Sequence, residues 1–145
     1  MTILLVEDNE DDVFLMQFAL KTAGICNPLQ VVEDGERAVE YLQGSGEYAD
    51  RTRFPYPAII FLDVKLPYMS GFDVLEWMKS RSDLASTPVV VLSSSNSPRD
   101  IALAAKFGVP YAIKPPDTDL FQRVAAQYNL SWLPEPAVRA PRRVG

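Results

Sequence analysis

The sequence predicts an α/β protein with one five-stranded parallel sheet that carries helices on both faces. The chain has 145 residues, of which 48% are hydrophobic, and this suits one globular domain with its own core. Five short apolar runs alternate with stretches of helical periodicity. Because the runs are apolar throughout instead of alternating with polar residues, they are expected to be strands buried on both faces.

The first two units run through strand 3–6, helix 11–23, strand 29–32 and helix 36–43. Residues 3–6 form a short apolar run with β-branched residues, which favours a buried strand. In the first helix, Met16 and Leu20 fall at helical spacing, and Gly24 suits the C-terminal end. The second helix shows the same one-sided apolar pattern. Residues 44–57 contain Gly, Pro and Tyr and predict a long loop.

The other three units run through strand 58–62, helix 72–81, strand 89–92, helix 98–107, strand 111–113 and helix 119–128. The fourth helix has the clearest start signal, with Ser97 as N-cap, Pro98 in the first turn and Asp100 at the third position. Either Asp117 or Thr118 is expected to cap the last helix.

Composition excludes several classes of function. The chain contains one cysteine, Cys26, and no histidine, which excludes a disulfide framework, a Ser-His-Asp triad and a histidine-ligated metal. Any metal is expected to have oxygen ligands, and these favour a hard ion such as Mg²⁺. The net charge of −5 argues against nonspecific binding of nucleic acid, so DNA is not an expected partner.

Sequence patterns near the two ends of the chain predict one domain followed by a disordered tail. We expect a domain over residues 1–133 and a disordered tail over residues 134–145, because the tail holds three prolines and no periodicity. No signal-peptide pattern opens the sequence, and the longest apolar run, residues 58–62, is too short to span a bilayer. A cytoplasmic protein with no membrane partner is expected.

Polar residues stand directly after four of the five predicted strands. Glu7 and Asp8 follow the first strand, Asp63 the third, Ser93 the fourth and Lys114 the fifth. Ligands of parallel α/β sheets bind beyond the carboxyl ends of the strands, so these side chains are expected to form one site. Three carboxylates attract a divalent cation, and a carboxylate beside an ammonium and a hydroxyl can accept a phosphoryl group.

A simpler explanation of the acidic residues is electrostatic, since acids are common in the first turn of a helix. It accounts for Glu10, Asp11 and Asp12, which we assign to this role. It does not account for an apolar strand that leads into Asp63, or for Lys114 placed before two prolines.

Other α/β sites fit the sequence less well. The turn after the first strand lacks the glycine-rich motif of a dinucleotide site, and the chain has no P-loop motif. A phosphatase with an acid nucleophile usually needs a second acid two residues further on, where this chain has Lys65.

The strand-end residues resemble the receiver domain of two-component response regulators. The resemblance covers roughly residues 2–128 and rests on Glu7, Asp8, Asp63, Ser93 and the Lys114-Pro115 pair. It implies a flavodoxin-like (βα)5 fold, a bound Mg²⁺ and phosphorylation by a partner histidine kinase.

Two further motifs carry the resemblance. Residues 66–71, Leu-Pro-Tyr-Met-Ser-Gly, resemble the family's LPxMxG turn, and Tyr111 stands at its aromatic switch position, three residues before the lysine. The acidic run 7–12 and the long loop 44–57 resemble the response regulators associated with bacterial phytochromes.

The resemblance also implies a role for each residue. Asp63 is the expected phosphorylation site. The metal ligands are expected to be Glu7, Asp8, Asp63 and the backbone carbonyl of Lys65. The phosphoryl-binding and switch residues are expected to be Ser93, Lys114 and Tyr111.

We therefore expect a single-domain response regulator of a phosphorelay, which catalyses no reaction beyond its own phosphotransfer and dephosphorylation. Its expected partner is a sensor histidine kinase, with a bacteriophytochrome as a candidate. A homodimer is expected through the face made by residues 98–107, 111–113 and 119–128, and the apolar segment 130–133 is expected to dock on the body or to cover the dimer contact.

Three alternatives stay open at this point. The chain could be a receiver that binds partners without phosphorylation, although the complete set of strand-end residues argues against it. It could be a small phosphatase that uses Asp63 as its nucleophile. It could also be a flavin-binding protein of the same fold, which the acidic first loop disfavours.

Overall fold

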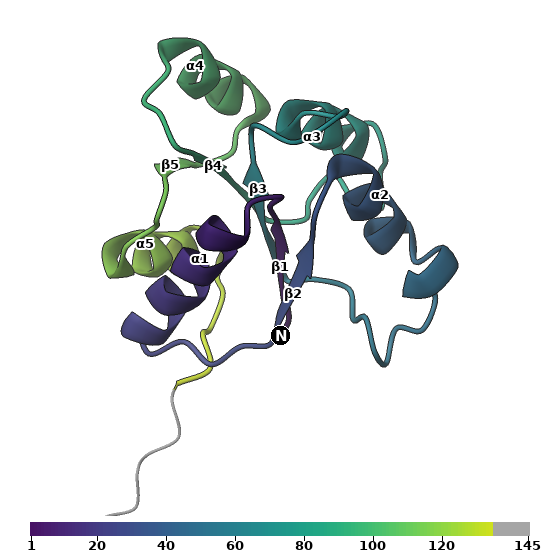
Figure 1. The fold of residues 1–145 in the computed structure, drawn as a ribbon, viewed down its shortest axis with the longest axis horizontal. Coiled ribbons are helices and arrows are strands. Elements are labelled where there is room, and N and C mark those ends of the chain that lie inside the picture. The colour runs from purple at the N-terminus through teal and green to yellow at the C-terminus, as the bar shows by residue number, and fades with distance from the viewer. Residues whose placement is uncertain (135–145) are drawn as a thin grey trace, which may run out of the picture.

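The computed structural model describes residues 1–134 and contains a single five-stranded sheet in that range. The strands are β1 (Ile3–Val6), β2 (Leu29–Val32), β3 (Ile59–Asp63), β4 (Val89–Ser93) and β5 (Tyr111–Ile113). All pairs are parallel, in the order β2-β1-β3-β4-β5 (Figure 1). The predicted fold class is therefore confirmed.

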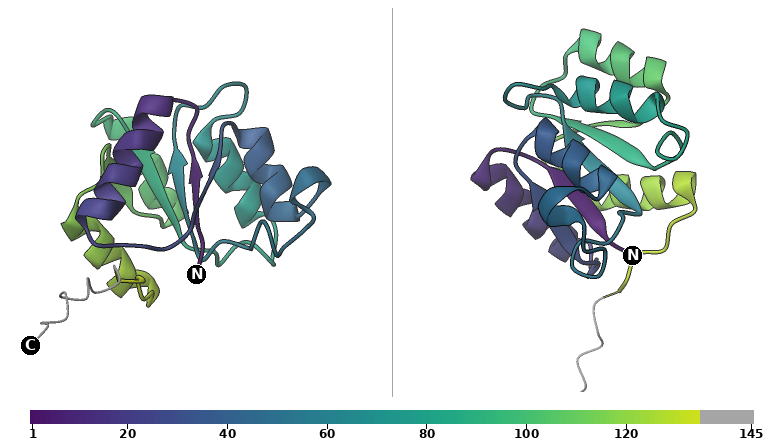
Figure 2. Two further views of the ribbon diagram at one scale, coloured as in Figure 1. Left: turned by 60° about the horizontal axis from the view of Figure 1, so that its bottom comes forward. Right: turned by 90° about the vertical axis from the view of Figure 1, so that its right-hand side faces the viewer.

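Helices cover both faces of this sheet. They are α1 (Glu10–Thr22), α2 (Gly35–Gln43), α3 (Gly71–Lys79), α4 (Pro98–Phe107) and α5 (Thr118–Tyr128). Helices α1 and α5 pack on one face, and α2, α3 and α4 pack on the other (Figure 2).

Alternation of side chains along the strands divides the core into two layers. On β1 and β3, one set packs with α2, α3 and α4, and consists of Leu4, Val6, Ile60 and Leu62. The other set packs with α1 and α5, and consists of Ile3, Leu5, Ile59 and Phe61. Both sets are apolar because both faces are covered, which explains why the strands read as continuous apolar runs.

Each α-helix begins at a side chain that accepts a hydrogen bond from the backbone of its first turn. These N-caps are Asn9, Asp34, Ser70, Ser97 and Asp117. Helix α3 begins at Gly71, earlier than predicted, because Ser70 and Asp73 cap each other's backbone N–H groups. Strands β3 and β4 run one residue further than predicted, so that Asp63 and Ser93 end the strands.

The predicted loop 44–57 is ordered around one arginine. It contains a short 3-10 helix, Gly46–Tyr48. The Arg51 guanidinium donates to the carbonyl oxygens of Tyr41, Leu42 and Phe54, at 2.8, 2.9 and 3.2 Å. The first two carbonyls belong to the last turn of α2, whose carbonyls have no partner within the helix. Arg51 therefore closes this helix end and holds the loop against it.

The segment after α5 docks on the body, as expected. Trp132 donates its indole N–H to the Phe121 carbonyl at 2.9 Å, and its ring lies edge-on to the Phe121 ring. The Leu133 N–H donates to the side-chain oxygen of Asn27, and the Cys26 N–H donates to the Leu133 carbonyl. The tail expected over 134–145 lies, beyond Pro134, outside the described residues.

None of the helices in the described part of the chain combines the length and apolar character needed to cross a bilayer.

Candidate functional site

The carboxyl ends of β1, β3, β4 and β5 bring the predicted polar residues to one edge of the sheet. Glu7 follows β1, Asp63 ends β3 and Ser93 ends β4, and their exposed fractions are 2%, 4% and 2%. Asp8 is exposed at the mouth of the site. Lys114 follows β5, and its backbone N–H donates to the Ser93 carbonyl at 2.8 Å, which joins the ends of β4 and β5.

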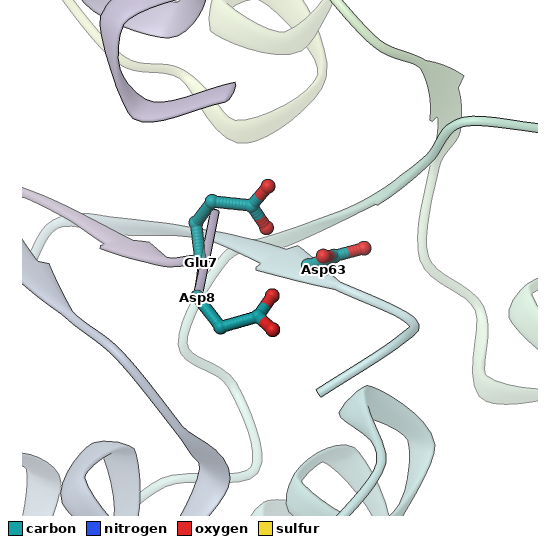
Figure 3. A group of neighbouring side chains, drawn as sticks. All are labelled: Glu7, Asp8 and Asp63. Carbon is teal, nitrogen blue, oxygen red and sulfur yellow. The ribbon is translucent and has the colours of Figure 1, made fainter. Parts of the chain in front are cut away.

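Three carboxylates converge at this edge. Glu7, Asp8 and Asp63 each offer an oxygen, and these oxygens lie within 4.8 Å of one another. Figure 3 shows Glu7 and Asp8 extending from the end of β1 toward the side on which Asp63 lies. One oxygen of the buried Glu7, Oε2, has no hydrogen-bond partner. A hard oxygen-seeking cation suits this donor set, because it would both neutralise the carboxylates and satisfy the orphaned oxygen.

Lys114 neutralises part of this negative charge. Its ammonium lies 2.9 Å from Glu7 Oε1, 2.8 Å from Asp12 Oδ2 and 3.2 Å from Asp63 Oδ2. An ammonium has three N–H donors, so every donor of Lys114 has a carboxylate acceptor. The contact with Asp12 corrects the sequence analysis, which assigned Asp12 to the helix N-terminus alone.

Burial sets the protonation of this cluster. Burial, together with the nearby Asp63 and Asp12, raises the pKa of Glu7 to about 9. For Lys114, burial favours the neutral form, but the carboxylates of Asp12, Glu7 and Asp63 outweigh it and raise the pKa. The neighbouring Glu7 carboxyl and the Lys114 ammonium lower the pKa of Asp12. Burial thus favours the protonated form of Glu7, whereas the acidic neighbours of Lys114 favour its charged ammonium form.

The loop after β3 wraps closely around Asp63. The Lys65 N–H donates to Asp63 Oδ1 at 3.3 Å, whereas the Lys65 side chain is exposed. The Gly71 N–H donates to the Val64 carbonyl at 3.0 Å, and a Cβ at Gly71 would lie 2.2 Å from the Asp63 carbonyl oxygen. The glycine that ends the LPxMxG-like turn is thus required for close approach of the loop to Asp63.

The two expected switch residues meet at the loop after β4. The Ser93 hydroxyl accepts a hydrogen bond from the Ser95 N–H at 3.2 Å. The Tyr111 hydroxyl donates to the Ser95 carbonyl. Ser93 and Tyr111 are therefore linked through one residue of the loop. The partly exposed Tyr111 ring packs at the edge of the core.

Sequence reasoning missed two residues of this site. Asp12 looked like one of three similar helix-start acids, and only the position of Lys114 at the end of β5 distinguishes it. Gly71 was noted as part of a turn, but its contact with the Asp63 backbone depends on how the loop folds back. The available signals were the acidic first turn of α1 and the glycine at the end of the LPxMxG-like turn.

Comparison with known proteins finds a matching family and similar structures. The family described as "Response regulator receiver domain" matches residues 3–125. Response regulator Rcp1 of Synechocystis sp. is 42% identical over 99 residues, which cover 68% of this chain and 65% of that relative. In structure, the Mn(2+)-bound form of Rcp1 matches with a TM-score of 0.71 and 37% identity, over 94% of this chain and 99% of that one.

Two other solved structures are similar. The bacteriophytochrome response regulator AtBRR matches with a TM-score of 0.80 and 33% identity, over 96% of this chain and 97% of that chain. The phosphorylated cyanobacterial phytochrome response regulator RcpA matches with a TM-score of 0.71 and 38% identity, over 87% and 89% of the two chains. The resemblance to phytochrome-associated response regulators is thereby confirmed.

Proposed function

This chain belongs to the response regulator receiver family, and on that premise we propose that it is a cytoplasmic signalling switch controlled by phosphorylation of Asp63. The observation that carries the proposal is the environment of Asp63. This carboxylate is buried at the end of β3, and its two oxygens accept from the Lys114 ammonium and the Lys65 N–H. A carboxylate held in this way is oriented as a nucleophile.

The proposed reaction is transfer of a phosphoryl group from a phosphohistidine of a sensor kinase. An Asp63 oxygen attacks the phosphorus, an O–P bond forms, the P–N bond breaks, and the imidazole leaves and regains a proton. Lys114 supplies positive charge beside the incoming phosphoryl oxygens. Ser93 lies at the neighbouring strand end, where its hydroxyl can turn from Ser95 to a phosphoryl oxygen.

We propose Glu7, Asp8, Asp63 and the Lys65 carbonyl as the residues that hold Mg²⁺. The convergent oxygens and the unpartnered Oε2 of Glu7 fit such an ion. When bound, Mg²⁺ supplies neutralisation of phosphoryl oxygens. The protein's own contribution is to keep these carboxylates together and to release the proton of Glu7, because a carboxylate must be ionised to bind a metal.

The switch itself is proposed to be the Ser93–Ser95–Tyr111 connection. A phosphoryl group on Asp63 adds negative charge that recruits the Ser93 hydroxyl. Ser93 then gives up its bond from Ser95, and the Ser95 loop, which also accepts from Tyr111, can move. Tyr111 would turn inward and change the surface next to α4 and β5.

Phosphotransfer from histidine kinases tests the function. Each kinase of the source organism, starting with the one encoded nearest and any bacteriophytochrome, is phosphorylated and mixed with the protein and Mg²⁺. We expect rapid loss of label from one kinase and its gain by this protein. If no kinase transfers label but the protein hydrolyses a small phosphate ester repeatedly, the phosphatase alternative replaces this proposal.

We also propose that the face of α4, β5 and α5 forms a homodimer. Ile101 and Ile113, 39% and 47% exposed, provide an apolar centre. Arg99, Lys106 and the Asp119–Arg123 pair, joined at 2.8 Å within α5, supply charges around it.

Solution size, measured with and without phosphodonor, tests the dimer. We expect a dimer, or a shift toward one on phosphorylation, and loss of it in Ile113→Glu. The control is Phe18→Glu, which changes an equally apolar exposed residue on α1. A monomer at all concentrations in both states would exclude the dimer.

A further inference from the structure

Lys114 has a third acidic partner that the proposed function does not use. Glu7 and Asp63 are proposed to bind metal and phosphoryl group. Asp12 belongs to the first turn of α1 and is not one of the three carboxylates that converge as a possible cation site. Even so, its contact with the ammonium is the shortest of the three, at 2.8 Å.

The surroundings of the contact between Asp12 and Lys114 are partly buried and hold Asp12 in place. The Lys114 side chain is 13% exposed and that of Asp12 is 28% exposed. Apolar residues wall the small cavity beside them, namely Leu5, Leu15, Met16, Leu92, Pro115 and Pro116. The backbone of Asp12 is itself fixed, because its N–H donates to the Asn9 cap at 3.1 Å. Asp12 is therefore an anion in a fixed position, and its surroundings contain less water than the protein surface. A charge pair is stronger in such surroundings.

Occupancy of the site changes what Lys114 can pair with. A divalent cation on Glu7 and Asp63 would compete for the oxygens that the ammonium now contacts, and would also repel the ammonium. A phosphoryl group on Asp63 would likewise replace its carboxylate oxygen as an acceptor. Asp12 is the remaining ionic partner of Lys114 within residues 1–134.

On the premise of the proposed function, we propose that Asp12 is the positioning residue that keeps Lys114 in the site. Its carboxylate pairs with the ammonium from the side of α1 while the other two acids serve the metal and the phosphoryl group. Without Asp12, the Lys114 ammonium in the metal-bound site would lie beside a cation, and the ammonium would have no anionic partner of its own. The neighbouring Asp11 provides a matched control, since it carries the same charge in the same turn but is exposed and makes no contact with Lys114.

The ¹⁵N-detected ammonium resonance of Lys114 tests the pairing directly. In the wild type we expect slow proton exchange both with and without added Mg²⁺. In Asp12→Asn with Mg²⁺, we expect exchange to be faster by about fivefold, the scale of one partly exposed ion pair. Asp11→Asn should match the wild type. Unchanged exchange in Asp12→Asn, or an equal change in Asp11→Asn, would overturn the proposal.

Phosphorylation kinetics with acetyl phosphate test the consequence. Asp12→Asn should lower the maximal rate by about fivefold with little change in KM, because Lys114 is misplaced while access of the donor is not. In a Lys114→Gln background the same substitution should have no further effect. Additive losses would overturn the proposal. If the wild type gains no label, the proposed function fails, and the ammonium resonance still decides the role of Asp12.

Discussion

Two partly buried cations, Arg51 and Lys114, hold two regions of the molecule together in different ways. Arg51 lies in the loop after α2, donates to three neutral carbonyls and sits 5.7 Å from the ring centres of both Tyr41 and Tyr56. Lys114 lies at the sheet edge and donates to three carboxylates. Arg51 therefore contacts neutral carbonyl dipoles and aromatic rings, whereas Lys114 contacts more acidic side chains than its single charge can neutralise.

The difference separates a structural centre from a reactive one. The Arg51 guanidinium donates to three backbone carbonyls, and a Cβ at Gly44 would lie 2.8 Å from it, so the packing at this helix end is tight. Around Lys114 one Glu7 oxygen has no hydrogen-bond partner, and burial raises the pKa of Glu7 above that of a carboxyl group in water. A region with more acidic side chains than cations favours the binding of a metal ion, and the ion pairs of Lys114 can then rearrange.

The largest expected effect comes from Lys114→Gln. Loss of a fixed cation beside the reacting group should slow labelling by a small phosphodonor about a hundredfold. The metal-free variant should also lose stability, because Glu7, Asp12 and Asp63 lose their cation. Added Mg²⁺ should restore much of that stability. Labelling rates and urea unfolding with and without Mg²⁺ measure both effects, and labelling at the wild-type rate would remove Lys114 from the reaction.

Arg51→Ala should give the opposite result. It removes the donor of the Leu42 and Phe54 carbonyls, one of two donors to the Tyr41 carbonyl, and two ring contacts. We therefore expect a loss of about 3 kcal/mol in the free energy of unfolding. Mg²⁺ should not restore it, and the labelling rate of the folded protein should stay unchanged. Arg53→Ala is the control, since the side chain of Arg53 is exposed and its guanidinium lies over the Phe54 ring, at 5.3 Å. A slower labelling rate in Arg51→Ala would show that the two regions are coupled.

Ser93→Ala should separate chemistry from response. The variant keeps Asp63 and Lys114, so we expect it to be labelled, at a rate lowered by no more than about tenfold. On phosphorylation, the ring resonances of Tyr111 should then stay at their positions in the unphosphorylated protein. The variant lacks the Ser93 hydroxyl, which connects Asp63 to Tyr111 through Ser95. A Tyr111 shift on phosphorylation equal to that of the wild type would refute the switch.

A further expected effect is a pH dependence of the free energy of unfolding, due to Glu7. Its pKa of about 9 in the folded, metal-free protein is above the value of 4.5 for a free glutamate. Between these pH values the folded chain binds more protons than the unfolded chain, so this group lowers the free energy of unfolding as pH rises from about 4.5 to about 9. Glu7→Gln should flatten the slope in urea unfolding. Glu36→Gln, at an exposed residue of α2, should not.

Most of the fold follows from local patterns in the sequence. Apolar runs located every strand to within one residue, and caps such as Ser97 located the helices, because these signals depend on neighbours in sequence. The residues gathered at the sheet edge were also predictable, since parallel strands must present their ends together.

What could not be predicted depends on distant contacts. Asp12 is 102 residues from Lys114. It has the same residue type as Asp11 beside it, and only its spacing of four residues from the buried Met16 sets it apart. Arg51 is one of two arginines in the loop, and its three carbonyl acceptors appear only when the chain turns back on α2. Such roles depend on contacts between residues that are far apart in sequence, and local patterns do not identify the partners.

The central claim is that Asp63 is the phosphoryl acceptor, and intact mass is its most direct test. Wild-type protein and Asp63→Asn are incubated with acetyl phosphate and Mg²⁺ and weighed without digestion. We expect the wild type to gain the mass of one phosphoryl group and Asp63→Asn to gain none. The same mass gain in Asp63→Asn would contradict it.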